Sequence, residues 1–158
     1  MNVVEVQGLE KLQKRLQAMQ SKYEKVEDVF VGYTQPYAIY VHEATRMTLK
    51  GVPRKKPSIG RYWDPPGSGP KFLEKPAREL AGILGSMIAT LVKRGVTFQD
   101  AIYKAGVYLQ YQSQRLVPID FGALFASAFT AKESELEQKS ADAYAKSMMF
   151  RNRRTKKT

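Results

Sequence analysis

Apolar and polar positions near the beginning of the chain follow a helical period. Apolar residues recur there at intervals of three or four, at Leu9, Leu12, Leu16 and Met19, and basic residues lie between them. This spacing places the apolar side chains on one face, so it predicts an amphipathic helix from Leu9 to Met19. A helix this short is marginal by itself, and we expect it to pack against another element.

From Val26 to Glu43 the pattern changes to one dominated by β-branched and aromatic residues, which favour strands. The run is interrupted at Gln35-Pro36. Because proline lacks a backbone N–H, it belongs at a turn or at a sheet edge. The segment therefore predicts a pair of strands joined by a turn near residues 34–36. A further strand is expected over Leu124–Thr130.

Two long helices are predicted in the middle of the chain. The first runs from Pro76 to Arg94, where apolar residues step by three and one and form a broad stripe. Its proline suits the first helical turn, and Gly95 suits the helix end. The second runs from Thr97 to about Leu116 and begins with a Thr-x-x-Asp run that resembles a capping box. A polar helix is expected over Lys132–Met149.

These elements predict an α+β fold in a single domain, residues 1–149. A small antiparallel sheet, built from residues 26–43 and 123–131, is expected to pack against the two long helices. The chain has 158 residues, of which 43% are hydrophobic, and this is enough for a substantial core. No apolar stretch approaches the roughly 20 residues needed to cross a bilayer, so no membrane association is expected.

A long loop, residues 44–70, separates the predicted strands from the first long helix. It contains five of the chain's eight prolines and the only tryptophan. A loop this long in a compact domain is usually functional or disordered, and tryptophan and arginine are favoured anchors at protein interfaces. We therefore predict that the loop contacts a neighbouring subunit or another partner. The expected contact residues are Arg46, Lys50, Arg54, Lys55, Lys56, Arg61, Tyr62 and Trp63.

The formal net charge of +11 comes from two segments. The segment from Ala44 to Trp63 carries six basic residues, the last eight residues carry five, and neither contains an acidic residue, which leaves the remaining chain neutral. We predict a flexible basic tail over residues 150–158. Such a tail binds polyanions through contacts that salt weakens, or it only keeps the protein in solution. The candidate polyanion contacts are Arg151, Arg153, Arg154, Lys156 and Lys157.

Three motifs lie around the loop. They are Tyr37-Ala38-Ile39-Tyr40-Val41-His42-Glu43, Lys71-Phe72-Leu73 with Pro76-Ala77, and Val117-Pro118 with Asp120, Gly122, Leu124 and Ser127. Together they resemble a family of tailed-phage neck proteins, known as head–tail joining, tail-completion or minor virion proteins. The resemblance spans about Val29 to Thr130. The chain departs from the family pattern at Phe121, where Thr is usual, and at Ala44-Thr45, where Gly-Thr is usual. Many members also carry the motifs in a different order.

The resemblance implies a structural virion protein, made in the cytoplasm of a bacterial host and built into the neck or upper tail. The implied partners are further copies of the chain, in a ring such as a hexamer, and other neck, connector or tail proteins. Contact with DNA is a further expectation. The motif residues themselves are expected to serve the fold, with Phe72 and Leu73 in the core, Asp120 accepting hydrogen bonds in a turn, and Gly122 at a positive φ.

The sequence offers little for catalysis. Its single histidine, His42, has no cysteine and no second histidine with which to build a metal site or a catalytic triad. If this segment is a strand, His42 and Glu43 point to opposite faces. We therefore expect no enzyme activity, no metal and no cofactor. The alternative function is a basic nucleic-acid-binding accessory protein, whose basic segments contact phosphates while Tyr62 and Trp63 stack on bases.

Overall fold

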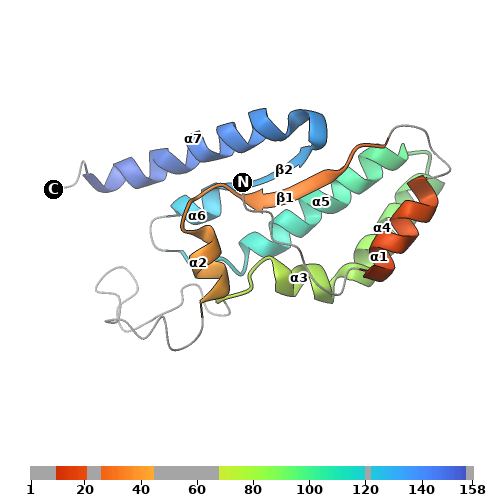
Figure 1. Cartoon of the computed structure of the whole chain (residues 1–158), viewed down its shortest axis with the longest axis horizontal. Helices are drawn as coiled ribbons and strands as arrows, with labels where there is room; N and C mark the ends of the chain where they lie inside the picture. The colour runs from red at the N-terminus through yellow and green to blue at the C-terminus, as the bar shows by residue number, and fades with distance from the viewer. Residues whose placement is uncertain (1–9, 21–25, 45–67, 120–121, 156–158) are drawn as a thin grey trace.

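A computed structural model describes residues 10–20, 26–44, 68–119 and 122–155 of the chain (Figure 1). Its elements, in chain order, are α1 (Glu10–Gln20), β1 (Val29–Tyr33), α2 (Ala38–Glu43), α3 (Glu74–Glu79), α4 (Ala81–Lys93), α5 (Phe98–Gln114), α6 (Ala123–Ala126), β2 (Ala128–Lys132), a 3-10 turn (Glu133–Glu135) and α7 (Leu136–Thr155).

Strands β1 and β2 form an antiparallel sheet, which has two strands within the described ranges. Their register pairs Val29 with Lys132 at one end and Tyr33 with Ala128 at the other. Figure 1 shows the sheet as a middle layer, with α7 on one side and α5 on the other. Helix α4 packs against α5, and α1 lies beside α4. The predicted α+β fold, a small antiparallel sheet packed against helices, is confirmed.

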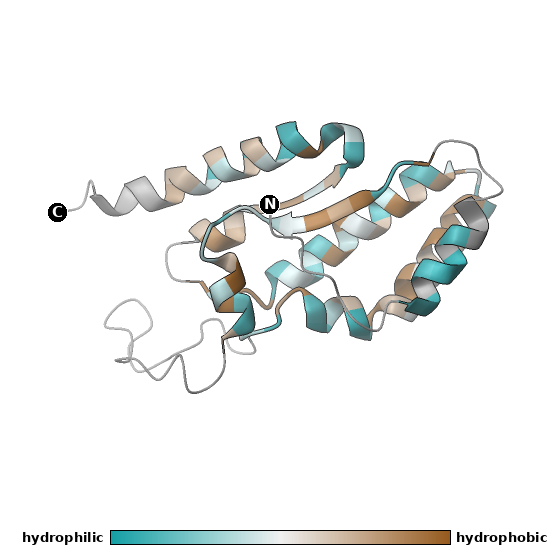
Figure 2. Ribbon diagram, viewed as in Figure 1, coloured by the Kyte–Doolittle hydropathy of each residue, from teal (hydrophilic) through white to brown (hydrophobic). Residues whose placement is uncertain are grey.

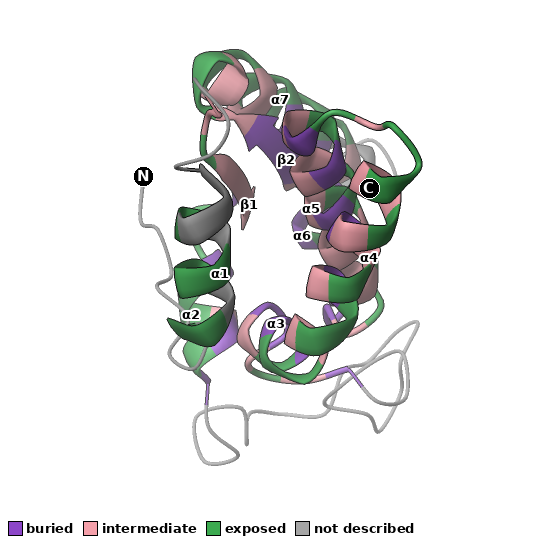
Figure 3. Cartoon of the chain, turned by 90° about the vertical axis from the view of Figure 1, so that its right-hand side faces the viewer, coloured by how far each residue is buried: buried purple, intermediate pink, exposed green. Residues whose placement is uncertain are grey.

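Hydrophobic side chains form three clusters that hold these layers together. Figure 2 shows brown, hydrophobic residues in β1, α2, α4 and α5. One cluster lies between α4 and α5 and buries Leu84, Ile88 and Phe98. A second lies between the sheet and α7 and buries Phe129 and Ala143. The third lies where α2, α3 and α6 meet the end of α5. In Figure 3 the buried parts of α5, α6 and β2 accordingly face the interior.

Helix α5 approaches the sheet closely because Gly106 has no side chain. A Cβ atom at this position would lie 3.0 Å from Cγ2 of Thr130 and 3.1 Å from Cγ1 of Val29. Hydrogen bonds maintain the same contact: the Thr130 hydroxyl donates to the side-chain Oε1 of Gln110 over 2.7 Å, and the Tyr103 hydroxyl donates to the Thr130 backbone oxygen over 3.4 Å. The glycine therefore sets the spacing between α5 and the sheet.

The predicted pair of strands within residues 26–43 is wrong in its second half. The residues after Pro36 form helix α2, in which Ala38 and His42 are buried while Tyr40 is exposed. Burial at a spacing of four residues matches a helix rather than a strand. Strand β1 pairs instead with β2, from the other end of the chain. Tertiary packing thus overrides the β propensity of the aromatic and branched residues in α2.

Two further boundaries differ from the prediction. The helix predicted over Pro76–Arg94 is divided into α3 and α4 at Leu80, whose φ of −97° and ψ of 3° lie outside the helical region. The strand predicted from Leu124 begins later, because residues 123–126 form the short helix α6. This helix starts after Gly122, whose φ is +80°, as expected for a glycine at a left-handed turn.

Several local predictions are confirmed. Helix α1 coincides with the first predicted helix, and the Thr97 side chain caps α5 by accepting a hydrogen bond from the Asp100 backbone N–H over 3.2 Å. Gly95, with a φ of +88°, follows α4. Helix α7 differs from the prediction, because it continues to Thr155 and so includes residues 150–155 of the predicted flexible tail. Among the described helices, none combines the length and the apolar character that a membrane span requires.

Substituting Gly106 with Val tests the spacing between α5 and the sheet. We expect this overpacking to lower the free energy of unfolding by about 1–3 kcal/mol, measured by urea denaturation. The matched control is Gly82→Ala in α4, where an added Cβ meets no atom within 4 Å. That substitution should leave stability unchanged or raise it by about 0.5–1 kcal/mol, because alanine favours a helix. Equal stability of G106V and the wild-type protein would refute the close contact.

Candidate functional site

The predicted contact loop emerges from a fixed base. Residues 45–67 lie outside the described part of the chain, but both flanks are described. On the far flank, the Lys71 N–H donates to the His42 backbone oxygen over 2.7 Å, and the Gly69 N–H donates to the Leu116 oxygen over 3.1 Å. These bonds tie the end of the loop to α2 and to the end of α5. The two ends of the loop are therefore held close together.

The expected contact residues of the loop all lie outside the described residues: Arg46, Lys50, Arg54, Lys55, Lys56, Arg61, Tyr62 and Trp63. Of the expected tail contacts, Arg151, Arg153 and Arg154 belong to the last turns of α7. Lys156 and Lys157 lie beyond the described residues. What the structure shows of the candidate site is thus the base from which the loop extends.

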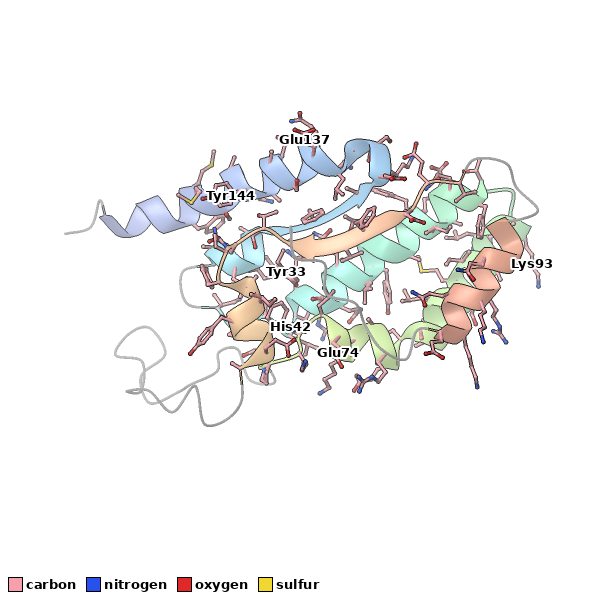
Figure 4. All side chains as sticks on the ribbon, in the orientation of Figure 1. Tyr33, His42, Glu74, Lys93, Glu137 and Tyr144 are labelled. Atoms are coloured by element: carbon pink, nitrogen blue, oxygen red, sulfur yellow. The ribbon has the colours of Figure 1, made fainter. Side chains whose placement is uncertain are left out.

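His42 is the centre of this base, and only 2% of its surface is exposed. Its Nε2 accepts a hydrogen bond from the Glu74 backbone N–H over 3.3 Å. Because a backbone N–H can only donate, the ring proton lies on Nδ1, which donates to Oε1 of Glu43 over 2.7 Å. The imidazole also stands edge-on to the Phe72 ring, with 4.9 Å between centroids. Figure 4 shows His42 and Glu74 close together at the junction of α2 and α3.

Charged side chains complete the base on its solvent side. Lys71 Nζ lies 2.5 Å from Oε2 of Glu43 and 3.0 Å from Oε2 of Glu74, and Arg78 pairs with the other oxygen of Glu74. The Lys71 ammonium, followed by His42, lowers the pKa of Glu43, and the same ammonium lowers the pKa of Glu74. The two carboxylates in turn raise the pKa of Lys71. We call His42, Glu43, Lys71 and Glu74 the loop-base cluster.

The backbone at Lys71 is unusual, because its φ of 57° lies in the left-handed region that residues other than glycine rarely adopt. This conformation costs free energy and persists only where the surroundings impose it. Here the Lys71 N–H is bonded to His42 and the side chain to two carboxylates. The loop-base cluster therefore maintains a sharp turn at the point where the loop rejoins the fold.

The expectation that His42 and Glu43 point to opposite faces is wrong. They lie at the end of helix α2 rather than in a strand, and their side chains are hydrogen-bonded to each other. Both ring nitrogens of His42 are engaged in hydrogen bonds, so the ring has no free lone pair for general-base chemistry. Within the described ranges, no group of three or more His, Asp or Glu residues is placed to hold a metal ion.

The three motifs meet in one buried cluster. Ala38 comes from the first motif, Phe72 and Leu73 from the second, and Val117 and Leu124 from the third. Phe72 and Leu73 lie in the core, as predicted.

The last residue of the third motif also links the elements. The hydroxyl of Ser127 is buried and donates to the Leu124 oxygen over 2.7 Å, while the Ser127 backbone oxygen accepts from the Thr34 N–H over 3.1 Å. Gly122 has the predicted positive φ, and Asp120 and Phe121 lie outside the described residues. The motifs thus form one structural unit around the base of the loop.

Sequence reasoning missed the pairing of Lys71 with the carboxylates of Glu43 and Glu74. Opposite charges on the two sides of the loop were visible, but Glu43 and Lys71 are 28 positions apart, and helical spacing rules relate only residues three or four apart. Glu43 and Lys71 meet because the two ends of the loop lie close together. Only the tertiary structure shows that the loop closes in this way.

Replacing Lys71 by Met tests the electrostatic part of the loop-base cluster. Glu43 and Glu74 have pKa values below their ordinary 4.5, so they stabilise the fold above pH 4.5 and lose this contribution as the pH falls through their folded pKa values. We expect K71M to be about 0.5–1 kcal/mol less stable than the wild-type protein at pH 7 in urea denaturation. The difference should shrink as the pH is lowered below 4.5.

Lys75→Met is the matched control, because Lys75 forms no ion pair with another residue of the described segments. It should leave stability unchanged over the same pH range. A K71M difference that stays constant from neutral to acidic pH would show that Lys71 acts through packing rather than through its charge.

Comparison with models of protein families, with curated proteins and with solved structures found no match to this chain. The resemblance to neck proteins therefore rests on the three sequence motifs alone.

Proposed function

We propose that the chain is a structural protein of a tailed-phage virion and forms part of the neck or upper tail, in head–tail joining or tail completion, as an oligomeric ring. The observation that carries the proposal is the buried cluster in which residues of all three motifs meet. Because the motifs share one core, their likeness to the neck-protein family concerns a single folded unit.

A ring requires two different surfaces that complement each other. One is the basic loop, which leaves the fold at the loop-base cluster. The other is an apolar surface nearby: α2 and α6 are joined through Ala38 and Leu124, and they expose Ile39, Tyr40 and Phe125. Large exposed apolar side chains gathered at one end of a molecule are typical of a protein interface. In the proposed ring, the loop of one subunit docks on its neighbour.

Electron microscopy with gold-labelled antibody tests the location in the particle. We expect an antibody to the purified chain to label the junction of head and tail of intact particles from the source lysate. Particles of an unrelated phage serve as the control. Absence of label from intact particles would contradict the proposal and would favour the nucleic-acid-binding alternative, which a salt-dependent DNA-binding assay would then examine.

Deleting residues 50–66 tests the docking role of the loop. The loop-base cluster lies outside the deletion and should hold the shortened ends together, so we expect an unchanged midpoint of urea denaturation. Incorporation into particles, measured by immunoblot of purified virions, should be lost. The matched control replaces the same residues by a Gly/Ser segment of equal length, which should also fail to be incorporated because it lacks the anchors. Normal incorporation of either variant would contradict the docking role.

A further inference from the structure

Strand β1 has one edge without a partner in the described part of the chain. Just beyond its two ends, the Glu133 N–H donates to the Asp28 oxygen and the Thr34 N–H donates to the Ser127 oxygen. Pairing alternates along an antiparallel ladder, so the even-numbered residues of β1 bond to β2. The backbone N–H and C=O groups of Val29, Val31 and Tyr33 therefore point to the opposite edge.

A groove with a volume of about 960 Å³ runs along this open edge. Strand β1 and the segment leading into α2 form one wall, and helix α7 forms the other with Leu136, Ala141 and Tyr144. Phe72 and Leu73 also line it. Figure 4 shows Glu137 and Tyr144 on α7, above the level of Tyr33. The lining is mainly apolar, so an empty groove would expose hydrophobic surface beside unpaired backbone groups.

The buried side chain of Gln35 is a second indication that the groove is occupied by a binding segment. It lines the groove, and only 3% of its surface is exposed. The Ser147 hydroxyl donates to the Tyr144 oxygen over 2.6 Å, so it must accept from Gln35 Nε2, which lies 2.6 Å away. This fixes the orientation of the amide and leaves the buried Gln35 Oε1 without a hydrogen-bond partner. A buried acceptor of this kind calls for an N–H donor from outside the described residues.

We propose that residues 2–7 of this chain, Asn-Val-Val-Glu-Val-Gln, lie in the groove as a third strand paired with the open edge of β1. Valine at positions 3, 4 and 6 favours a strand. In such a strand Val4 and Val6 share one face, which suits an apolar lining. The third strand supplies the backbone partners that β1 lacks and places an N–H donor near Gln35.

The segment is joined to the same fold by a short connection. Only Gly8 and Leu9 separate the segment from α1, which lies beside α4 in the same fold. Nine extended residues reach about 30 Å. A tethered segment also has an effective concentration in the millimolar range, which favours its own groove over that of another copy. The inference does not depend on the proposed virion function.

Amide hydrogen exchange followed by NMR tests the third strand residue by residue. In the wild-type chain we expect the amides of Val31 and Tyr33, which face the open edge, to be protected along with those of Gly32 and Thr34, which face β2. In V4D/V6D, two carboxylates would have to enter an apolar groove. We then expect Val31 and Tyr33 to exchange at least about tenfold faster while Gly32 and Thr34 are unchanged.

The Gly32 and Thr34 amides report whether the variant is still folded, and V4T/V6T is the matched control. Threonine keeps the β-branched shape, so this variant should keep the open edge protected. Rapid exchange of Val31 and Tyr33 in the wild-type chain would overturn the proposal, as would equal protection in V4D/V6D. Protection that is lost on dilution would also overturn it, because the strand would then come from another copy.

Discussion

The arrangement of the elements around the candidate site depends on the burial of one aromatic ring. Phe72 is 1% exposed and stands edge-on to two other rings, with centroids 5.0 Å from Tyr33 and 4.9 Å from His42. Edge-to-face contacts of this kind add to the free energy gained by removing apolar surface from water. Tyr33 belongs to β1, His42 to α2, and Phe72 to the segment before α3, so one ring joins three parts of the chain.

Polar bonds around Phe72 give this packing a unique geometry. The Tyr33 hydroxyl lies 2.7 Å from the Ser113 hydroxyl, which ties β1 to α5, and burial raises the pKa of Tyr33 so that the phenol stays protonated. His42 is bonded to the backbone of Glu74, which ties α2 to α3. Buried polar groups that are fully paired specify one arrangement, because any shift would leave a donor or acceptor unpaired. The polar contacts thus fix the relative orientation of the elements that the apolar contacts hold together.

This core also explains how a neutral fold can carry strongly basic segments. The loop that holds much of the positive charge leaves and rejoins the fold at the loop-base cluster, whose two carboxylates, Glu43 and Glu74, are paired with Lys71 and Arg78. With such a base, the stability of the fold does not depend on the side chains of the loop.

The sequence by itself determined the features that depend on neighbouring residues: the helical periods of α1, α4 and α5, the polar helix α7, the capping of α5 by Thr97, and the positive φ of Gly122. It also determined that Phe72 and Leu73 are core residues. Tertiary structure alone decided that Ala38–Glu43 is a helix, because the only described partner of β1 comes from residues 128–132. It alone decided that Glu43 meets Lys71, because the closure of the loop brings them together. Local sequence patterns reflect the conformational preferences of short segments, whereas strand pairing and side-chain burial depend on residues far apart in the chain.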